Sequence, residues 1–196
     1  TPLSEITVCE PTEEALEAID QLLWEILWEP VGLPRNVRQR FKLPGSEVIF
    51  VAMHRKQLVG TVVGQSQNER EMELRHLAVR PDMQGNGVGR GLVAKLVEYS
   101  LNHGYISIST HARNTSQTFF EKHGFQPVPG ETLTHPVFDN PRINFLFMRR
   151  LLKQRDTLPI ALLQPQRVSA LVTVLYARNR PPASVFEPSL HRLSRL

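Results

Sequence analysis

The stretch that decides the fold is residues 74–92, LRHLAVRPDMQGNGVGRGL. It completes an alternating segment over 71–79, which predicts a strand, and it opens a segment in which apolar residues from Val88 to Val97 recur at helical spacing. The loop between them is rich in glycine, which lets a ligand approach the backbone because it has no Cβ. The first N–H groups of a helix have no partner inside it and carry the positive end of its dipole. The stretch therefore predicts a phosphate site, and its spacing suits a pyrophosphate.

Two common phosphate-binding loops do not match this stretch. A dinucleotide-binding G-x-G-x-x-G pattern would need glycine at position 90 or 92, where the chain has Arg90 and Leu92. A P-loop would need Gly-Lys-Ser/Thr, which the sequence does not contain. The pattern that remains is Gln84-x-x-Gly87-x-Gly89 after a strand.

This pattern resembles the pyrophosphate loop, Arg/Gln-x-x-Gly-x-Gly/Ala, of the GNAT superfamily of acetyl-CoA-dependent N-acetyltransferases. Residues 110–125, THARNTSQTFFEKHGF, resemble the second cofactor segment of that family, in which an asparagine precedes a short helix ending in Gly-Phe. The resemblance runs in element order over about residues 6–148 and is specific from 71 to 125.

The resemblance implies that acetyl-CoA is the co-substrate and that no metal takes part. The amides of the glycine-rich loop would bind the pyrophosphate, and Leu77–Val79 would pair with the pantetheine arm as an added strand does. Asn114 would hydrogen-bond the same arm, and Arg90 would either bind phosphate or lie on a solvated helix face. The predicted cofactor residues are Leu77, Ala78, Val79, Gln84, Gly85, Asn86, Gly87, Val88, Gly89, Arg90 and Asn114.

The resemblance also suggests a catalytic residue. Acetyl transfer needs a neutral amine and therefore a general base. Several family members place a glutamate five residues before the position of Ala78, which is Glu73 here; a role as a surface carboxylate stays open. Glu71 and His76 are alternatives, and the two-residue period of a strand puts Glu71 on the face of Glu73 and His76 on the opposite face.

Phe120 departs from the family pattern. Many members protonate the leaving thiolate with a tyrosine at this position, four residues before the glycine of Gly-Phe. Either Tyr105, Ser109, His111 or water takes that role, or the thiolate leaves unaided, which a thiol pKa of about 8.5 allows. The departure keeps a second function open, a noncatalytic acyl-CoA-binding sensor or regulatory module.

The rest of the pattern predicts an α/β (α+β) fold with a mixed, mostly antiparallel sheet flanked by helices. We expect further strands over 5–9, 48–53, 58–63, 106–110 and 143–148, and helices over about 12–27, 35–41, 88–102 and 116–123. In the family, the first helices help to shape the acceptor site, which would place Trp24, Trp28, Glu25, Glu29 and residues 35–40 near it. Core packing of the tryptophans and a solvated arginine face are the alternatives.

Composition narrows the class of protein. The 196 residues are 41% hydrophobic and 21% charged, which excludes a wholly disordered, collagen-like or coiled-coil chain. The single cysteine, Cys9, excludes an intrachain disulfide and favours a reducing compartment. Because the first ten residues contain no apolar run, we expect a cytoplasmic protein.

The positive charge is concentrated at the C-terminal end, where residues 149–196 carry nine Lys or Arg against two acidic residues. We expect a GNAT-like domain over 1–150 and a basic, proline-containing extension over 151–196, with one amphipathic helix over 166–178. No stretch is apolar enough to suggest a membrane span, and the domain is net negative, so nucleic-acid binding by it is not expected. The expected partner is a small-molecule or peptide amine; a homodimer stays open.

Overall fold

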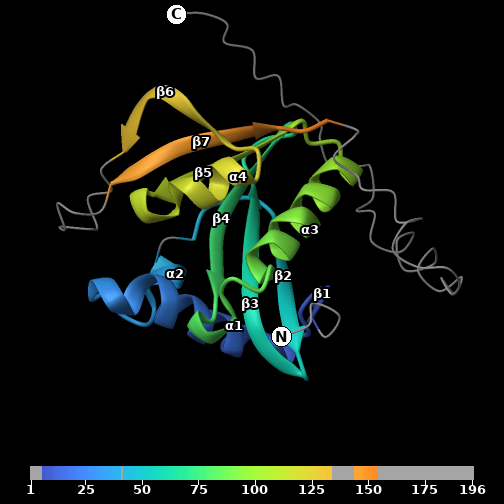
Figure 1. Cartoon of the computed structure of the whole chain (residues 1–196), viewed down its shortest axis with the longest axis vertical. Coiled ribbons are helices and arrows are strands. Elements are labelled where there is room, and N and C mark those ends of the chain that lie inside the picture. The colour runs from blue at the N-terminus through green and yellow to red at the C-terminus, as the bar shows by residue number, and fades with distance from the viewer. Residues whose placement is uncertain (1–5, 41, 134–143, 154–196) are drawn as a thin grey trace, which may run out of the picture. The chain divides into compact units, whose positions relative to one another are not determined.

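The structure is a computed structural model, and it describes residues 6–40, 42–133 and 144–153. Their strands form one sheet in the order β1-β2-β3-β4-β5-β7-β6 (Figure 1). Among these strands only β4 and β5 pair in parallel, and the other neighbours are antiparallel, so the predicted mixed, mostly antiparallel sheet is confirmed. The strands are β1 (Ile6–Cys9), β2 (Glu47–His54), β3 (Gln57–Ser66), β4 (Glu71–Val79), β5 (Ser107–Arg113), β6 (Gln126–Leu133) and β7 (Phe145–Leu151).

Helices cover both faces of this sheet (Figure 1). On one face lie α1 (Leu16–Leu23) and α2 (Val37–Arg40), and on the other α3 (Val88–Asn102) and α4 (Gln117–Lys122). Because side chains alternate along a strand, Val62 is buried in the core under α3, whereas Val63 is buried in the core under α1. The helix predicted over 12–27 is divided into a 3-10 turn (Glu13–Ala15), α1, a π turn (Trp24–Trp28) and a second 3-10 turn (Glu29–Val31).

The strands expected over 48–53 and 58–63 form a hairpin. Its turn consists of Arg55 and Lys56, whose φ angles of 48° and 63° are left-handed. Two residues of this kind match the right-handed twist of the flanking strands, so the turn brings β3 directly beside β2.

Strand β6 is absent from the sequence prediction. Its segment contains Pro127, Pro129 and Gly130, residues that weaken a strand pattern because proline cannot donate to a ladder and glycine packs no side chain. The structure accommodates the prolines because β6 lies at the edge of the sheet, where its register with β7 is interrupted between Pro127 and Thr132.

A bulge in β4 corrects the predicted orientation of His76. Val63 pairs with His76 and Gly64 pairs with Leu74, so Arg75 has no partner in the register with β3. One extra residue reverses the alternation of faces. His76 therefore lies on the same face as Glu73, against Trp28 beside α1, and not on the opposite face.

The same strand parts from β5 shortly after the two meet. Among the described residues, β4 and β5 pair only over Glu71–Glu73 and Ser107–Ser109. Beyond this point no strand within the described part of the chain pairs with the β5-side edge of Leu77–Val79, and the space between β4 and β5 becomes a cleft.

The predicted extension 151–196 and its helix over 166–178 lie outside the described residues, apart from residues 151–153. Leu151 ends β7, and the N–H of Leu152 donates to the carbonyl of Ile106 at 2.9 Å. Within the part of the chain that the structure describes, no helix has the length and apolar character needed to cross a membrane.

Candidate functional site

A cavity of about 900 Å³ lies between the end of β4, the start of α3 and α4. Every predicted loop residue from Gln84 to Arg90 lines it, and so do Leu77 and Val79. The geometry thus brings together two segments that the sequence assigned to one cofactor.

The loop conformation explains its glycines. Gly85 and Gly87 have φ angles of 77° and 79°, in the left-handed region that favours glycine. Gly87 is the N-cap of α3, and its carbonyl accepts the N–H of Gly91 at 2.9 Å. A Cβ on Gly89 would lie 3.2 Å from the ring of Phe119, so glycine also permits close packing there. The first N–H groups of α3 border this cavity without partners inside the helix, as an anion site requires.

Two predicted cofactor residues are placed differently. Ala78 is buried in the core under α1 and does not line the cavity, so only its backbone could contribute. Asn114 begins the turn before α4, is exposed and does not line this cavity. Its backbone N–H donates to the carbonyl of Asn144 at 3.0 Å. Its neighbours Arg113, Thr115 and Ser116 line the cavity instead.

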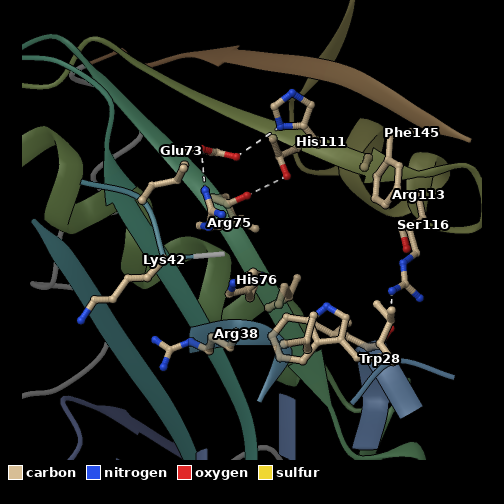
Figure 2. Close-up of a pocket in the computed structure, with 18 of the residues that line it drawn as sticks. Trp28, Arg38, Lys42, Glu73, Arg75, His76, His111, Arg113, Ser116 and Phe145 are labelled. Carbon is tan, nitrogen blue, oxygen red and sulfur yellow. Dashed lines mark hydrogen bonds and ion pairs between the residues drawn. The ribbon is translucent and has the colours of Figure 1, made fainter. Parts of the chain in front are cut away.

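A second cavity, of about 630 Å³, adjoins the first on the face covered by α1 and α2. Figure 2 shows Glu73 and His111 on one side of it and Trp28 and Arg38 on the other. Five residues line both cavities: Leu27, Leu77, Arg113, Ser116 and Phe120. We call the first the loop cavity and the second the Glu73 cavity.

Glu73 is 8% exposed, and its carboxylate is held by three neighbours. The side-chain amide of Gln67 donates to Oε2 at 2.7 Å, and Nδ1 of His111 lies 3.2 Å from Oε1. Arg75 completes the group, with Nη1 3.8 Å from Oε2. The carboxylate is thus oriented within the cavity. Glu71, the first alternative, lines neither cavity, and its carboxylate lies 3.3 Å from Arg149.

His76 lines the same cavity as Glu73 and meets the indole of Trp28 edge-on, with ring centroids 5.1 Å apart. Burial, with the positive charges of Arg75 and Arg38, lowers the pKa of His76 to about 3. The imidazole is therefore neutral at neutral pH.

Among the charged side chains that line the Glu73 cavity, cations outnumber carboxylates. Arg38 is fixed by Asp20 at 2.6 Å and Glu47 at 2.7 Å, whereas Arg40 and Lys42 are exposed. Arg113 donates to the carbonyl of Leu27, and burial lowers the pKa of its guanidinium. The cationic lining residues are Arg38, Arg40, Lys42, Arg75 and Arg113, against the single carboxylate of Glu73.

Phe120 lies where the two cavities meet, 6% exposed and packed edge-on against Phe119 and Phe125. Of the groups named as substitutes for a tyrosine there, Tyr105 and Ser109 line neither cavity, whereas His111 lines the Glu73 cavity. Ser116, which sequence reasoning missed, lines both cavities.

Only part of the predicted acceptor region lines the Glu73 cavity. Trp28, Arg38 and Arg40 do, but Trp24, Glu25, Glu29 and Arg35 do not. Trp24 donates through Nε1 to the carbonyl of Leu33 at 2.9 Å, and Arg35 lies 2.8 Å from Glu17, so both have structural contacts. Gln67, Arg75 and Lys42 were missed: the bulge that carries Arg75 has no sequence signal, and the other two lie in irregular segments.

Among the described residues, no group of three or more His, Cys, Asp or Glu side chains is arranged to hold a metal ion.

The sequence of this chain matches a known protein family and a curated relative. A family model described as Acetyltransferase (GNAT) family matches residues 14–125, more than half of the chain. The N-acetylaspartate synthetase of Danio rerio is 26% identical over 101 residues, which are 50% of this chain and 36% of that protein. The chain thus spans little more than a third of that relative's length.

Solved structures share the fold at low sequence identity. The ribosomal-protein-S18-alanine N-acetyltransferase of Escherichia coli superposes with a TM-score of 0.62 at 17% identity, over 76% of this chain and 94% of that one. A GNAT family acetyltransferase of Elizabethkingia anophelis with acetyl-CoA bound gives 0.58 at 17% identity, over 76% and 99%. An aminoglycoside 6'-N-acetyltransferase complexed with coenzyme A gives 0.62 at 16% identity, over 75% and 97%.

Proposed function

The chain belongs to the GNAT acetyltransferase family, and from this premise we propose that it transfers the acetyl group of acetyl-CoA to a primary amine by direct attack. One observation carries the proposal. A cavity lined by the glycine-rich loop and a cavity lined by an oriented carboxylate meet at Leu77, Ser116 and Phe120. A thioester at this junction would be reached by an amine from the side of Glu73.

The loop cavity has the features that acetyl-CoA needs. The backbone amides from Gln84 to Arg90 supply donors for the pyrophosphate, and the positive end of α3 favours its charge. The unpaired edge of Leu77–Val79 offers backbone groups to the amides of the pantetheine arm, as in strand addition. Asn114 would need to turn its exposed side chain toward this arm in order to bind it.

The reaction joins the amine nitrogen to the acetyl carbon and breaks the carbon–sulfur bond. The attacking ammonium must first lose a proton, and Glu73 is our choice of acceptor, directly or through a water molecule. Gln67 and His111 hold its two oxygens from different sides, which limits its rotation. A fixed base lowers the entropic cost of the step.

The leaving thiolate has no tyrosine at the usual position, because Phe120 lacks a hydroxyl. A thiol of pKa about 8.5 leaves readily near neutral pH. Ser116 at the junction could donate a hydrogen bond to the sulfur, and water would supply the proton. Phe120 is also the observation that favours the second candidate function, a noncatalytic acyl-CoA sensor.

The experiment that separates these functions is isothermal titration with acetyl-CoA and CoA, followed by measurement of thiol release with a panel of amines. Binding together with amine-dependent thiol release would support the transferase. Binding without release from any amine of the panel favours the sensor, and absence of binding rejects both.

The family does not decide the acceptor. The names of the similar proteins refer to a ribosomal protein, an aminoglycoside and N-acetylaspartate. For this chain the acceptor must be inferred from its own cavity.

A further inference from the structure

We propose that the acceptor is a primary amine that also carries a carboxylate, that is, an amino acid, with aspartate-like and glutamate-like dicarboxylic compounds preferred. The inference rests on the proposed function and adds the substrate class. It is carried by the charge of the Glu73 cavity, in which five cationic side chains face one carboxylate.

The cations are not needed to hold acetyl-CoA. The loop cavity supplies the backbone amides and the helix terminus for the pyrophosphate. Arg38, Arg40, Lys42 and Arg75 line the Glu73 cavity alone, and only Arg113 lines both. Four positive groups therefore surround the space left for the acceptor.

These groups are not all neutralised by protein carboxylates. Arg38 is paired with Asp20 and Glu47, and Arg75 shares Glu73 with His111. The side chains of Arg40 and Lys42, in contrast, form no hydrogen bond or ion pair with another described residue. The cavity therefore keeps a positive potential that favours an anionic ligand.

The cavity provides positive charge at two depths. The side chains of Arg75 and Arg38 are 17% and 18% exposed, whereas Arg40 and Lys42 are exposed at the rim. Arg75 lies beside Glu73, whereas Arg38 lies on the other side of the cavity, toward Trp28 (Figure 2). Two separated sources of positive charge suit a molecule with two carboxylates better than one with a single carboxylate.

The same charges disfavour other amines. An ammonium ion without a carboxylate meets one attractive group, Glu73, and several repulsive ones, so an aminoglycoside or a lysine-rich peptide would bind poorly. A carboxylate on the acceptor compensates this repulsion. The nearby cations also lower the pKa of the bound ammonium, which favours the neutral amine that attacks the thioester.

The test compares acceptors that differ in carboxylate number on one carbon skeleton. With saturating acetyl-CoA, thiol release is measured for glutamate, glutamine and glutamine amide, and for aspartate, asparagine and asparagine amide. A tetrapeptide with N-terminal aspartate distinguishes a peptide source from a free amino acid. We expect kcat/KM to fall with each carboxylate removed, by about tenfold per step if each loss costs about 1.4 kcal/mol.

Charge reversal at the rim tests the cavity itself. In Lys42→Glu we expect KM for glutamate to rise about fivefold, since two charge units change near a solvated anion, while the affinity for acetyl-CoA stays unchanged. Lys56→Glu, in the turn between β2 and β3, is the matched control because Lys56 is exposed and lines neither cavity. Arg75→Gln provides a second variant, expected to raise KM for glutamate more than for glutamine.

Each outcome is decisive. An equal or higher kcat/KM for the amides, or an unchanged KM for glutamate in both variants, overturns the proposed acceptor class and leaves the transferase intact. Absence of thiol release with every amine rejects the proposed function. In that case, calorimetric titration with N-acetylglutamate decides whether the cavity binds carboxylates: binding weakened by Lys42→Glu supports the site, and no binding overturns it.

Discussion

The carboxylate of Glu73 on β4 lies 3.2 Å from Nδ1 of His111 on β5, at the point where the two strands stop pairing. The contact spans 38 positions of the chain. It ties the proposed base to the opposite wall of the cleft just beyond the last paired residues, Glu73 and Ser109. Glu73 is therefore held by the sheet on one side and faces the cavity on the other.

Replacing Glu73 tests its role as the base. We expect Glu73→Gln to lower kcat about 100-fold or more, because the isosteric amide cannot accept the proton. The loss should be greatest at low pH and should shrink as pH rises, since the free amine then needs no base. A pH profile of thiol release, with acetyl-CoA affinity measured in parallel, checks this.

Glu71→Gln is the control for this experiment. Glu71 lies on the same strand but pairs with Arg149 and lines neither cavity. Its variant should keep the wild-type profile. If Glu73→Gln were fully active at every pH, Glu73 would not be the base.

The glycine-rich loop makes a separate prediction. Gly87→Glu should abolish binding of acetyl-CoA, because a carboxylate at the N-cap of α3 repels phosphate and its Cβ occupies the approach to the amides. Calorimetry measures the binding, and thermal unfolding measures the cost of a side chain at φ 79°, about 1 to 2 kcal/mol.

Gly104→Glu is matched to Gly87→Glu in backbone and charge. Gly104 has φ 82°, has open space around its Cβ position and lines neither cavity. This variant should lose similar stability and keep its affinity for acetyl-CoA. Equal affinities in both variants would show that the loop does not hold the cofactor.

His76 predicts a pH dependence of stability. Its pKa of about 3 in the folded chain lies below the ordinary value of 6.5, so between these values the unfolded chain binds a proton that the folded chain does not. The free energy of unfolding should therefore fall as pH falls below 6.5, by about 1 kcal/mol per pH unit from this group. Urea unfolding of His76→Gln should show a shallower fall between pH 6.5 and 4.5; parallel curves would contradict the assignment.

Because Arg38 lines the Glu73 cavity and forms two ion pairs, we expect it to contribute to the free energy of unfolding. It joins α2 to Asp20 of α1 and Glu47 of β2, and the three side chains are 16–24% exposed. Arg38→Met should destabilise the chain by about 2 kcal/mol, because it leaves two half-buried carboxylates unpaired. A double-mutant cycle with Asp20→Asn in urea unfolding measures the coupling.

Arg35→Met provides the comparison for that measurement. Arg35 pairs with Glu17, whose side chain is 87% exposed, and an exposed pair contributes about 0 to 1 kcal/mol. A loss in Arg38→Met no greater than that in Arg35→Met would mean that the Arg38 pairs do not stabilise the cavity wall.

Local patterns were sufficient for most elements of the fold. The hairpin at Arg55 and Lys56, strand β4 and helix α3 follow from alternation, helical spacing and turn residues in contiguous stretches. Strand β6 was not predictable in this way, because Pro127 and Pro129 are tolerated only by its position at the sheet edge. Edge position is a property of the assembled sheet.

The orientation of His76 was also beyond local patterns. Simple alternation along β4 would place His76 on the other face of the strand from Glu73. The bulge at Arg75 turns it to the same face as Glu73. A bulge depends on how β4 registers with β3, and the residues of β4 alone carry no sign of it.

By itself, the sequence determined the glycine-rich loop, because the backbone conformation of Gln84–Arg90 is set within one contiguous stretch. Only the tertiary structure decided the Glu73 cavity. Its walls come from α2, β4, β5 and the start of β7, and the distances among Arg38, Glu73 and His111 depend on strand pairing and on the parting of β4 from β5. Such contacts join residues far apart in the chain, so their geometry follows from packing and not from local pattern.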